Sequence, residues 1–183
     1  MNAINYAILP LFRYFDFKGR SSRSEFWWYS LFIFLIGILY FIYSIAMMPS
    51  FEDMMDPYFD DASLGYGFID YVYIIFSLLT FIPGLAVSVR RLHDINRTGW
   101  WIAAFYGLMT ASSALFAGAI ITIFVSFMFA MTGDTGGIAS SFGGAYTMII
   151  LAIGLFIGTF VWMVIWYATP SVNADNRFGD TPI

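Results

Sequence analysis

The stretch that decides the fold is residues 89–101, Val-Arg-Arg-Leu-His-Asp-Ile-Asn-Arg-Thr-Gly-Trp-Trp, which joins two long apolar segments. It contains the only histidine of the chain, His93, together with three of the eight Lys and Arg residues and two of the six tryptophans. Most of the remaining sequence is apolar enough to lie in lipid. We therefore expect the polar chemistry of the chain to be concentrated in this stretch.

The composition is that of an integral membrane protein. Of the 183 residues, 60% are hydrophobic and 11% are charged, and the mean hydropathy is +0.77, whereas a soluble domain has roughly 25% charged residues. The absence of cysteine excludes disulfides, thiol catalysis and cysteine-ligated metals. The length suits one membrane domain over residues 1–183.

Four apolar segments are long enough to cross a bilayer, which needs about 20 helical residues. They cover approximately residues 26–48, 68–89, 100–132 and 145–168. Ser22 followed by Glu25 forms a capping-box pattern that predicts the start of the first helix. Residues 100–132 are too few for two crossings of about 20 residues each and a turn, so we interpret them as one tilted or projecting span.

The segments between the spans are expected to be arms and loops. Residues 1–25 form an N-terminal arm, which either lies as an amphipathic segment on the membrane face or packs on its own helices. Residues 49–67 form an acidic connector without the spacing of a calcium-binding loop. We expect a polar loop at residues 90–99, a Gly-rich loop at 133–144 and a polar tail at 169–183.

The charge distribution predicts the topology. With four spans, all Lys and Arg residues fall on one side of the membrane, which the positive-inside rule makes the cytoplasmic side. These residues are Arg13, Lys18, Arg20, Arg23, Arg90, Arg91, Arg97 and Arg177. The expected fold is therefore an all-α polytopic membrane protein, a four-transmembrane-helix bundle with both termini cytoplasmic.

Three segments on the predicted cytoplasmic side mix arginine with carboxylate and amide groups: residues 18–25, 90–97 and 173–180. Arginine binds phosphate or carboxylate through paired hydrogen bonds, so an anionic lipid head group or a partner is a chemically sensible ligand. The alternative is that the arginines set the orientation and pair with nearby carboxylates. The candidate ligand-binding residues are Arg20, Arg23, Glu25, Arg90, Arg91, His93, Asp94, Asn96, Arg97, Asn176 and Arg177.

Catalysis and coupled transport have little support in the sequence. A lone His93 beside Asp94 is insufficient for acid–base chemistry or zinc binding, and we expect no catalytic residue, metal, cofactor or nucleic-acid partner. The apolar segments carry no ionisable side chain at depth, which argues against ion-coupled transport. A small-solute pore or carrier, or an enzyme that uses His93, remains an alternative.

Small residues predict close helix packing in two spans. Gly154 and Gly158 are four residues apart, as are Ala103, Gly107 and Ala111. Such faces let helices approach closely, either within the bundle or between two copies of the chain. A homo-oligomer through Gly154 and Gly158 is one expectation.

Residues 17–28 resemble the N-terminal "F-x-G-R-x-x-R-x-x-[FY]-W" signature of the bacterial inner-membrane family called domain of unknown function 805. Residues 83–101 are similar to its central "P-x-x-x-x-x-x-R-R-L-H-D-x-x-[RK]-[ST]-G-W-W" signature, and residues 176–179 to its closing "N-x-[FY]-G". The resemblance implies a small multi-span protein of the bacterial cytoplasmic membrane, and no activity. It adds weight to the three polar segments acting together.

Overall fold

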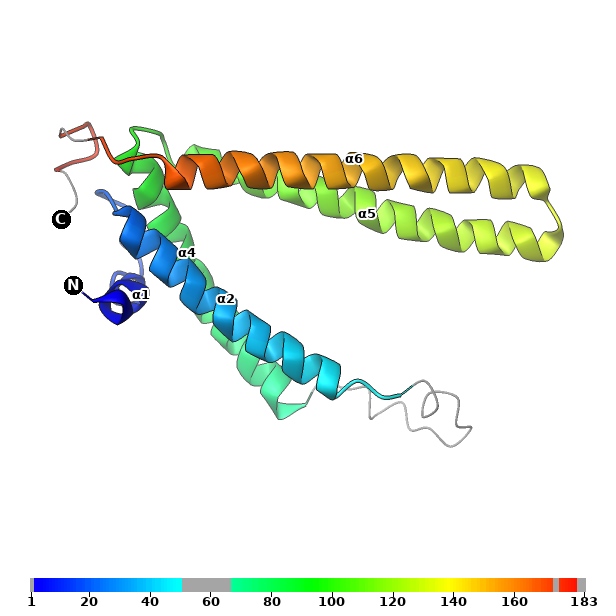
Figure 1. The fold of residues 1–183 in the computed structure, drawn as a ribbon, viewed down its shortest axis with the longest axis horizontal. Coiled ribbons are helices and arrows are strands. Elements are labelled where there is room, and N and C mark those ends of the chain that lie inside the picture. The colour runs from blue at the N-terminus through cyan, green and yellow to red at the C-terminus, as the bar shows by residue number, and fades with distance from the viewer. Residues whose placement is uncertain (1, 51–66, 173–174, 181–183) are drawn as a thin grey trace. The chain divides into compact units, whose positions relative to one another are not determined.

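The computed structural model describes residues 2–50, 67–172 and 175–180, and within them the chain forms five α-helices (Figure 1). These are α1 (Ala3–Phe12), α2 (Arg23–Ala46), α4 (Phe68–Asp94), α5 (Trp100–Thr132) and α6 (Thr135–Ala168). Four of them, α2, α4, α5 and α6, are long and apolar enough to cross a membrane. The predicted all-α fold with four candidate spans is confirmed, while the acidic connector lies almost wholly outside the described residues.

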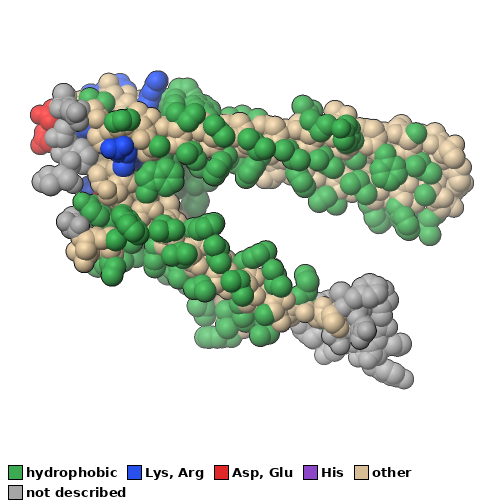
Figure 2. All heavy atoms as spheres, viewed as in Figure 1, with side chains coloured by type: hydrophobic (Ala, Val, Ile, Leu, Met, Phe, Trp, Pro, Cys, Tyr) green, Lys and Arg blue, Asp and Glu red, His purple; other side chains and the backbone are tan. Residues whose placement is uncertain are grey.

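The chain divides into two compact units. Unit 1 comprises residues 1–96 and 171–183 and contains α1, α2 and α4, and unit 2 comprises residues 97–170 and contains the α5–α6 hairpin. Figure 2 shows hydrophobic side chains along the outer surfaces of the helices in both units. A lipid surrounding explains why so many large apolar side chains are exposed, because lipid replaces the protein core as their apolar environment.

In unit 1, α2 and α4 pack together and α1 contacts both of them. The Ser22 hydroxyl accepts from the Glu25 amide at 3.3 Å, so Ser22 is confirmed as the N-cap of α2, while the Glu25 carboxylate accepts from Arg90. Farther along, the buried Tyr29 hydroxyl donates to the Thr80 carbonyl of α4 at 2.7 Å.

In unit 2, α5 and α6 pack against each other through small residues that recur every seven positions. Ser112, Ala119 and Ser126 of α5 are buried, and so are Ala145, Ala152 and Thr159 of α6. A repeat of seven residues places these side chains on one face of each helix, and this face forms the seam with the partner helix. The Ser112 hydroxyl donates to the Ala152 carbonyl at 2.8 Å across this seam.

The seam uses a different face from the predicted small-residue stripes. Gly107, Gly154 and Gly158 lie on the exposed sides of α5 and α6, and a Cβ added at any of them would meet no atom within 4 Å. These stripes therefore do not pack α5 against α6. Gly154 and Gly158 stay available for the proposed homo-oligomer.

One predicted loop proves to be largely helical, and another is helical over its first half. The Gly-rich segment 133–144 was expected to be a loop, but α6 begins at Thr135, so the turn consists of Gly133 and Asp134. Gly133 adopts φ +75°, which ends α5, and the Asp134 carboxylate accepts from the Gly137 amide and caps α6. Likewise, α4 continues through Arg90 and Arg91 to Asp94 instead of ending near Val89.

Candidate functional site

The last turn of α4 presents the charged residues of the central motif to the interior of unit 1. The Arg90, Arg91 and Asp94 side chains are fully buried, although these residue types are almost never buried without partners. Asn96 then adopts the left-handed conformation at φ 58°, and its amide donates to the His93 carbonyl, which ends the helix. Asn is the non-glycine residue best suited to this conformation.

Asp94 is the centre of one half of the cluster. Its carboxylate pairs with Arg91 one turn back on α4 and with Arg20 from the arm, whose Nη2 lies 2.8 Å away. The Ser171 hydroxyl, at the start of the tail, donates to the same carboxylate at 2.5 Å. One buried carboxylate therefore joins the arm, α4 and the tail.

Arg20 extends this connection to the backbone of the tail. Its Nη2 donates to the Val172 carbonyl at 2.6 Å and its Nη1 to the Gly179 carbonyl at 3.4 Å. The Val172 amide in turn donates to the Asp94 carbonyl at 3.4 Å. The segments that precede α2, end α4 and follow α6 thus meet at one end of unit 1.

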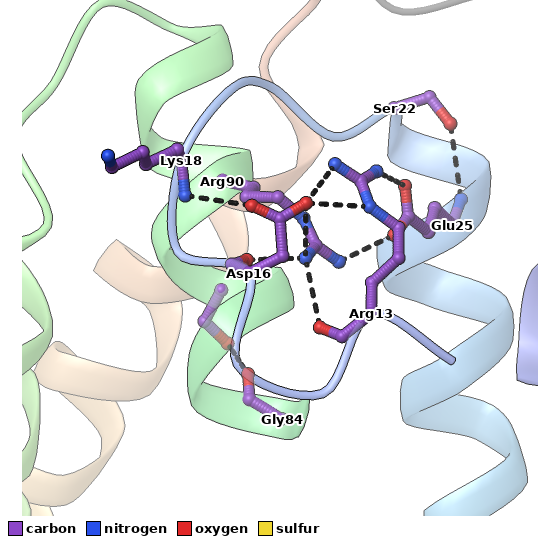
Figure 3. Close-up of polar contacts among 8 residues, drawn as sticks. Arg13, Asp16, Lys18, Ser22, Glu25, Gly84 and Arg90 are labelled. Atoms are coloured by element: carbon purple, nitrogen blue, oxygen red, sulfur yellow. Dashed lines mark hydrogen bonds and ion pairs between the residues drawn. The ribbon is translucent and has the colours of Figure 1, made fainter. Parts of the chain in front are cut away.

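Glu25 is the centre of the second half, shown in Figure 3. Arg90 donates from Nη2 to the Glu25 carboxylate at 2.8 Å and from Nη1 to the Asp16 carbonyl at 2.6 Å. Arg13 pairs with the Asp16 carboxylate at 2.6 Å and lies 3.9 Å from Glu25. The Ser21 amide donates to the Arg90 carbonyl at 3.2 Å, which joins the two halves.

The pKa of the Asp16 carboxyl is lowered from its ordinary value of 3.8. Partial burial alone raises this pKa, but the hydrogen bond and positive charge of Arg13 outweigh it, with help from the Lys18 amide and the charge of Arg90. The carboxylate form of Asp16 is therefore favoured by the fold. Its ion pair holds the turn that follows α1.

His93 is packed against the tail and the arm. Its ring stacks on Phe178 with centroids 3.9 Å apart, and its Nδ1 lies 3.2 Å from the Gly19 carbonyl. Asn176 donates from its side chain to the His93 carbonyl at 2.9 Å, which occupies one of the last carbonyls of α4. The arm backbone and Phe178 fix the imidazole, while the Asp94 carboxylate is held by Arg20, Arg91 and Ser171.

The chemistry of this arrangement is that of a paired, buried ion network. Within residues 2–50, 67–172 and 175–180, no three His, Asp or Glu side chains come together as a metal site. Breaking one partner of a buried ion pair typically costs 3–5 kcal/mol, because the other charge is left in a low-dielectric interior. In the described part of the chain, two buried polar atoms have no hydrogen-bond partner, Ser21 Oγ and Arg90 Nε.

The structure brings most of the predicted site residues together. Arg20, Glu25, Arg90, Arg91, His93, Asp94 and Asn176 form the cluster. Asn96 and Arg177 lie at its edge, where Arg177 donates to the Asn96 carbonyl at 3.4 Å. Arg23 is exposed, and Arg97 belongs to unit 2 and lies 4.9 Å over the Trp166 ring.

Four participants were missed by the sequence analysis: Arg13, Asp16, Ser171 and Phe178. The spacing of three between Arg13 and Asp16 is a usable signal for an ion pair across a turn. Phe178 is the aromatic position of the closing "N-x-[FY]-G" signature, whereas Ser171 carries no signal in the sequence. Their contacts depend on where the tail returns to α4.

Comparisons with known proteins agree with these motifs. A family model described as "Protein of unknown function (DUF805)" matches residues 14–180. Inner membrane protein YhaI of Escherichia coli K12 is 30% identical over 93 residues, 51% of this chain and 64% of YhaI, so the chain covers just under two thirds of that relative. Inner membrane protein YhaH of the same organism is 31% identical over 109 residues, 56% of this chain and 73% of YhaH. No solved structure matches the chain significantly.

Proposed function

Since the chain belongs to the DUF805 family of proteins of unknown function, we propose its function from the cluster itself: a non-enzymatic membrane protein that binds an anionic lipid head group. The multi-pass membrane location rests on the four apolar helices and the inner-membrane relatives. The head group would be held by cations exposed around the ion-paired cluster. The cluster joins the arm, α4 and the tail, and two of these cations, Lys18 and Arg177, extend from the arm and the tail.

The observation that carries the proposal is the contrast between buried and exposed cations in unit 1. Arg20, Arg90 and Arg91 are buried and donate to carboxylates and carbonyls of the chain. Lys18, Arg23 and Arg177 are exposed around them. Buried arginines neutralised by the protein are unsuited to take up a phosphate, whereas exposed Lys and Arg bind phosphate by charge and by hydrogen bonds.

The location of the exposed cations supports an anionic lipid as the ligand. They flank the polar ends of α2 and α4. In a bilayer crossed by these two helices, such ends would lie near the lipid phosphates. The positive-inside rule assigns this end to the cytoplasmic leaflet. Anionic lipids of that leaflet attract each nearby Lys or Arg with about 1 kcal/mol.

Native mass spectrometry of protein extracted from membranes that contain phosphatidylglycerol and phosphatidylethanolamine tests the proposal. The wild type should retain phosphatidylglycerol in preference, and the Lys18→Gln/Arg23→Gln/Arg177→Gln variant should lose that preference. The Arg23→Lys/Arg177→Lys variant is the matched control and should retain it, since both charges remain. Unchanged phosphatidylglycerol retention in the triple variant would exclude this function.

An enzyme built on His93 has weaker support. The half-buried imidazole stacks on Phe178 and is hydrogen-bonded to the Gly19 carbonyl, and these two contacts orient the ring. A catalytic base needs a carboxylate or carbonyl orienter and also a reachable substrate atom. Within the described residues, the contacts of His93 account for its orientation without a substrate.

A further inference from the structure

Two phenylalanine side chains are exposed at the end of α1. Phe12 ends the helix and is 79% exposed, and Phe15, in the turn that follows, is 76% exposed. Leaving a phenylalanine side chain in water costs about 1.5–3 kcal/mol relative to burying it. Two such side chains so close together call for an apolar environment.

The turn that carries them is firmly held. The Arg13 amide donates to the Leu9 carbonyl, and the Asp16 amide donates back to the Arg13 carbonyl, both at 3.2 Å. Buried Arg90 donates to the Asp16 carbonyl at 2.6 Å, and the Arg13–Asp16 ion pair closes the turn. The Phe15 ring packs edge-on against Tyr14 at 4.7 Å between the ring centroids. The exposure of Phe15 is therefore a fixed feature of unit 1.

The orientation of α1 matches that of a helix lying in the membrane plane. In Figure 1, α1 is seen nearly end-on while α2 and α4 run lengthwise across the view, so α1 lies across the spans that it contacts. The cap of α2 follows the arm directly, and Trp27 and Trp28 in its first two turns are partly exposed, as expected of rings in the interfacial belt. These features are those expected of an arm that lies beside the lipid head groups.

We propose that the arm is an in-plane membrane anchor, and that Phe12 and Phe15 insert into the boundary between head groups and acyl chains. Amphipathic helices bury their apolar face about 5–10 Å into this region. The partner is the bilayer that already surrounds α2 and α4. Buried Arg90 holds the turn at the depth where the two rings meet it. The anchor is independent of whether Lys18, Arg23 and Arg177 select anionic lipid.

Spin labels attached to single cysteines test the anchor in the full chain, which contains no other thiol. Phe12→Cys and Phe15→Cys are labelled in vesicles, and their collisions with dissolved oxygen are compared with those with a water-soluble nickel complex. Leu35→Cys, exposed in the middle of α2, is the lipid reference, and Asp175→Cys, exposed in the tail, is the aqueous reference.

Both arm labels should collide several-fold more with oxygen relative to nickel than the Asp175 label does, and should lie between the two references in depth. A ratio equal to that of the Asp175 label would show that the rings face water and would overturn the proposal. Low collision with both reagents would also overturn it, because it would show that protein covers the arm. Phe15→Cys loses the ring contact with Tyr14, but the hydrogen bonds and the ion pair that hold the turn do not involve the Phe12 or Phe15 side chains. The labelled variants therefore report on the native fold.

Discussion

At the scale of single residues, Asp94 is the carboxylate that neutralises two buried arginines of the cluster. The Arg20 and Arg91 side chains are 1% and 0% exposed and share this one carboxylate. Asp94→Ala should lower the free energy of unfolding by about 3–5 kcal/mol, because two guanidinium groups lose their buried counter-ion. Arg23→Gln, at an exposed arginine, should change it by no more than about 0.5 kcal/mol.

Thermal unfolding in detergent micelles measures both variants against the wild type. The Asp94→Ala protein should melt at a much lower temperature, and the Arg23→Gln protein should melt with the wild type. Similar melting temperatures for all three proteins would show that the buried pairs contribute little. The two variants thus compare the contribution to stability of a buried charge at Asp94 with that of an exposed charge at Arg23.

Two adjacent serines should respond in opposite ways. Ser22 caps α2 through its hydroxyl, so Ser22→Ala should destabilise the protein by about 1 kcal/mol. The Ser21 hydroxyl is buried without a partner, so Ser21→Ala removes an unsatisfied group and should leave stability unchanged or raise it. Melting temperatures of the two variants check this. A larger loss for Ser21→Ala would reveal a bound water at Ser21 Oγ.

The Asp16 pair predicts a pH dependence at acid pH. Because the fold lowers the pKa of this carboxyl below 3.8, its ion pair contributes fully at higher pH and is lost as the pH falls through the lowered pKa. Asp16→Asn should therefore be less stable than the wild type at pH 7, and the difference should shrink below about pH 4. Melting temperatures across this range measure the difference. Ser22→Ala removes no titratable group, so its melting temperature should stay below that of the wild type by the same amount across this pH range.

At the scale of elements, the α5–α6 seam separates two kinds of small residue. Ala152 is fully buried against α5, so Ala152→Leu should overpack the seam and destabilise unit 2 by about 1–3 kcal/mol. A side chain at Gly154, two residues away, meets open space. Gly154→Leu should leave the melting temperature of a monomer unchanged.

Gly154→Leu also tests the proposed homo-oligomer. If Gly154 and Gly158 face a second copy, the leucine would block close approach of the helices and shift the protein to monomer. Size-exclusion chromatography with light scattering in detergent reports that shift. Identical masses for wild type and variant, both monomeric, would remove the homo-oligomer proposal.

The sequence predicted the long helices well because their lengths and apolar content are dictated by the bilayer. It misplaced the start of α6 because glycine and serine are typical of loops in water. Here Asp134 caps the helix, and Ser141 donates back to the Gly137 carbonyl within it. The partner helix α5 is 33 residues long, and α6 matches it with 34.

The sequence predicted most of the residues of the candidate site, but it did not predict which of its arginines are buried. Positive charges near span ends are expected from topology alone, and nothing in the pattern of Arg90 and Arg91 shows that both point inward. Arg91 pairs with Asp94 three residues later on the same helix. The burial of Arg90 and Asp94 also depends on Glu25 and Arg20, which are contacts between distant parts of the chain. The division between buried and exposed arginines therefore needed the structure.

At the scale of the whole molecule, the cluster constrains the topology. Arg20 from the arm reaches Asp94 at the end of α4 and Val172 in the tail, so all three segments lie on one side of any membrane that α2 and α4 cross. The chain between Asp94 and Val172 must then cross an even number of times, which α5 and α6 satisfy.

Cysteine labelling in spheroplasts tests the predicted direction. A membrane-impermeant maleimide should modify Asp134→Cys, in the turn between α5 and α6, in intact spheroplasts. It should modify Arg177→Cys only after the membrane is made permeable, because the positive-inside rule assigns that side to the cytoplasm. Labelling of Arg177→Cys in intact spheroplasts would reverse the predicted orientation.

The backbone hydrogen bond from the Val172 amide to the Asp94 carbonyl closes unit 1 at the point where the polypeptide leaves for α5 and comes back from α6. The chain leaves unit 1 and returns to it at adjacent residues, so the α5–α6 hairpin is an insertion in unit 1. A change in the length or sequence of such an insertion should leave the contacts between the arm, α4 and the tail unaltered. Diversity in proteins built on this plan is therefore expected to accumulate in the hairpin.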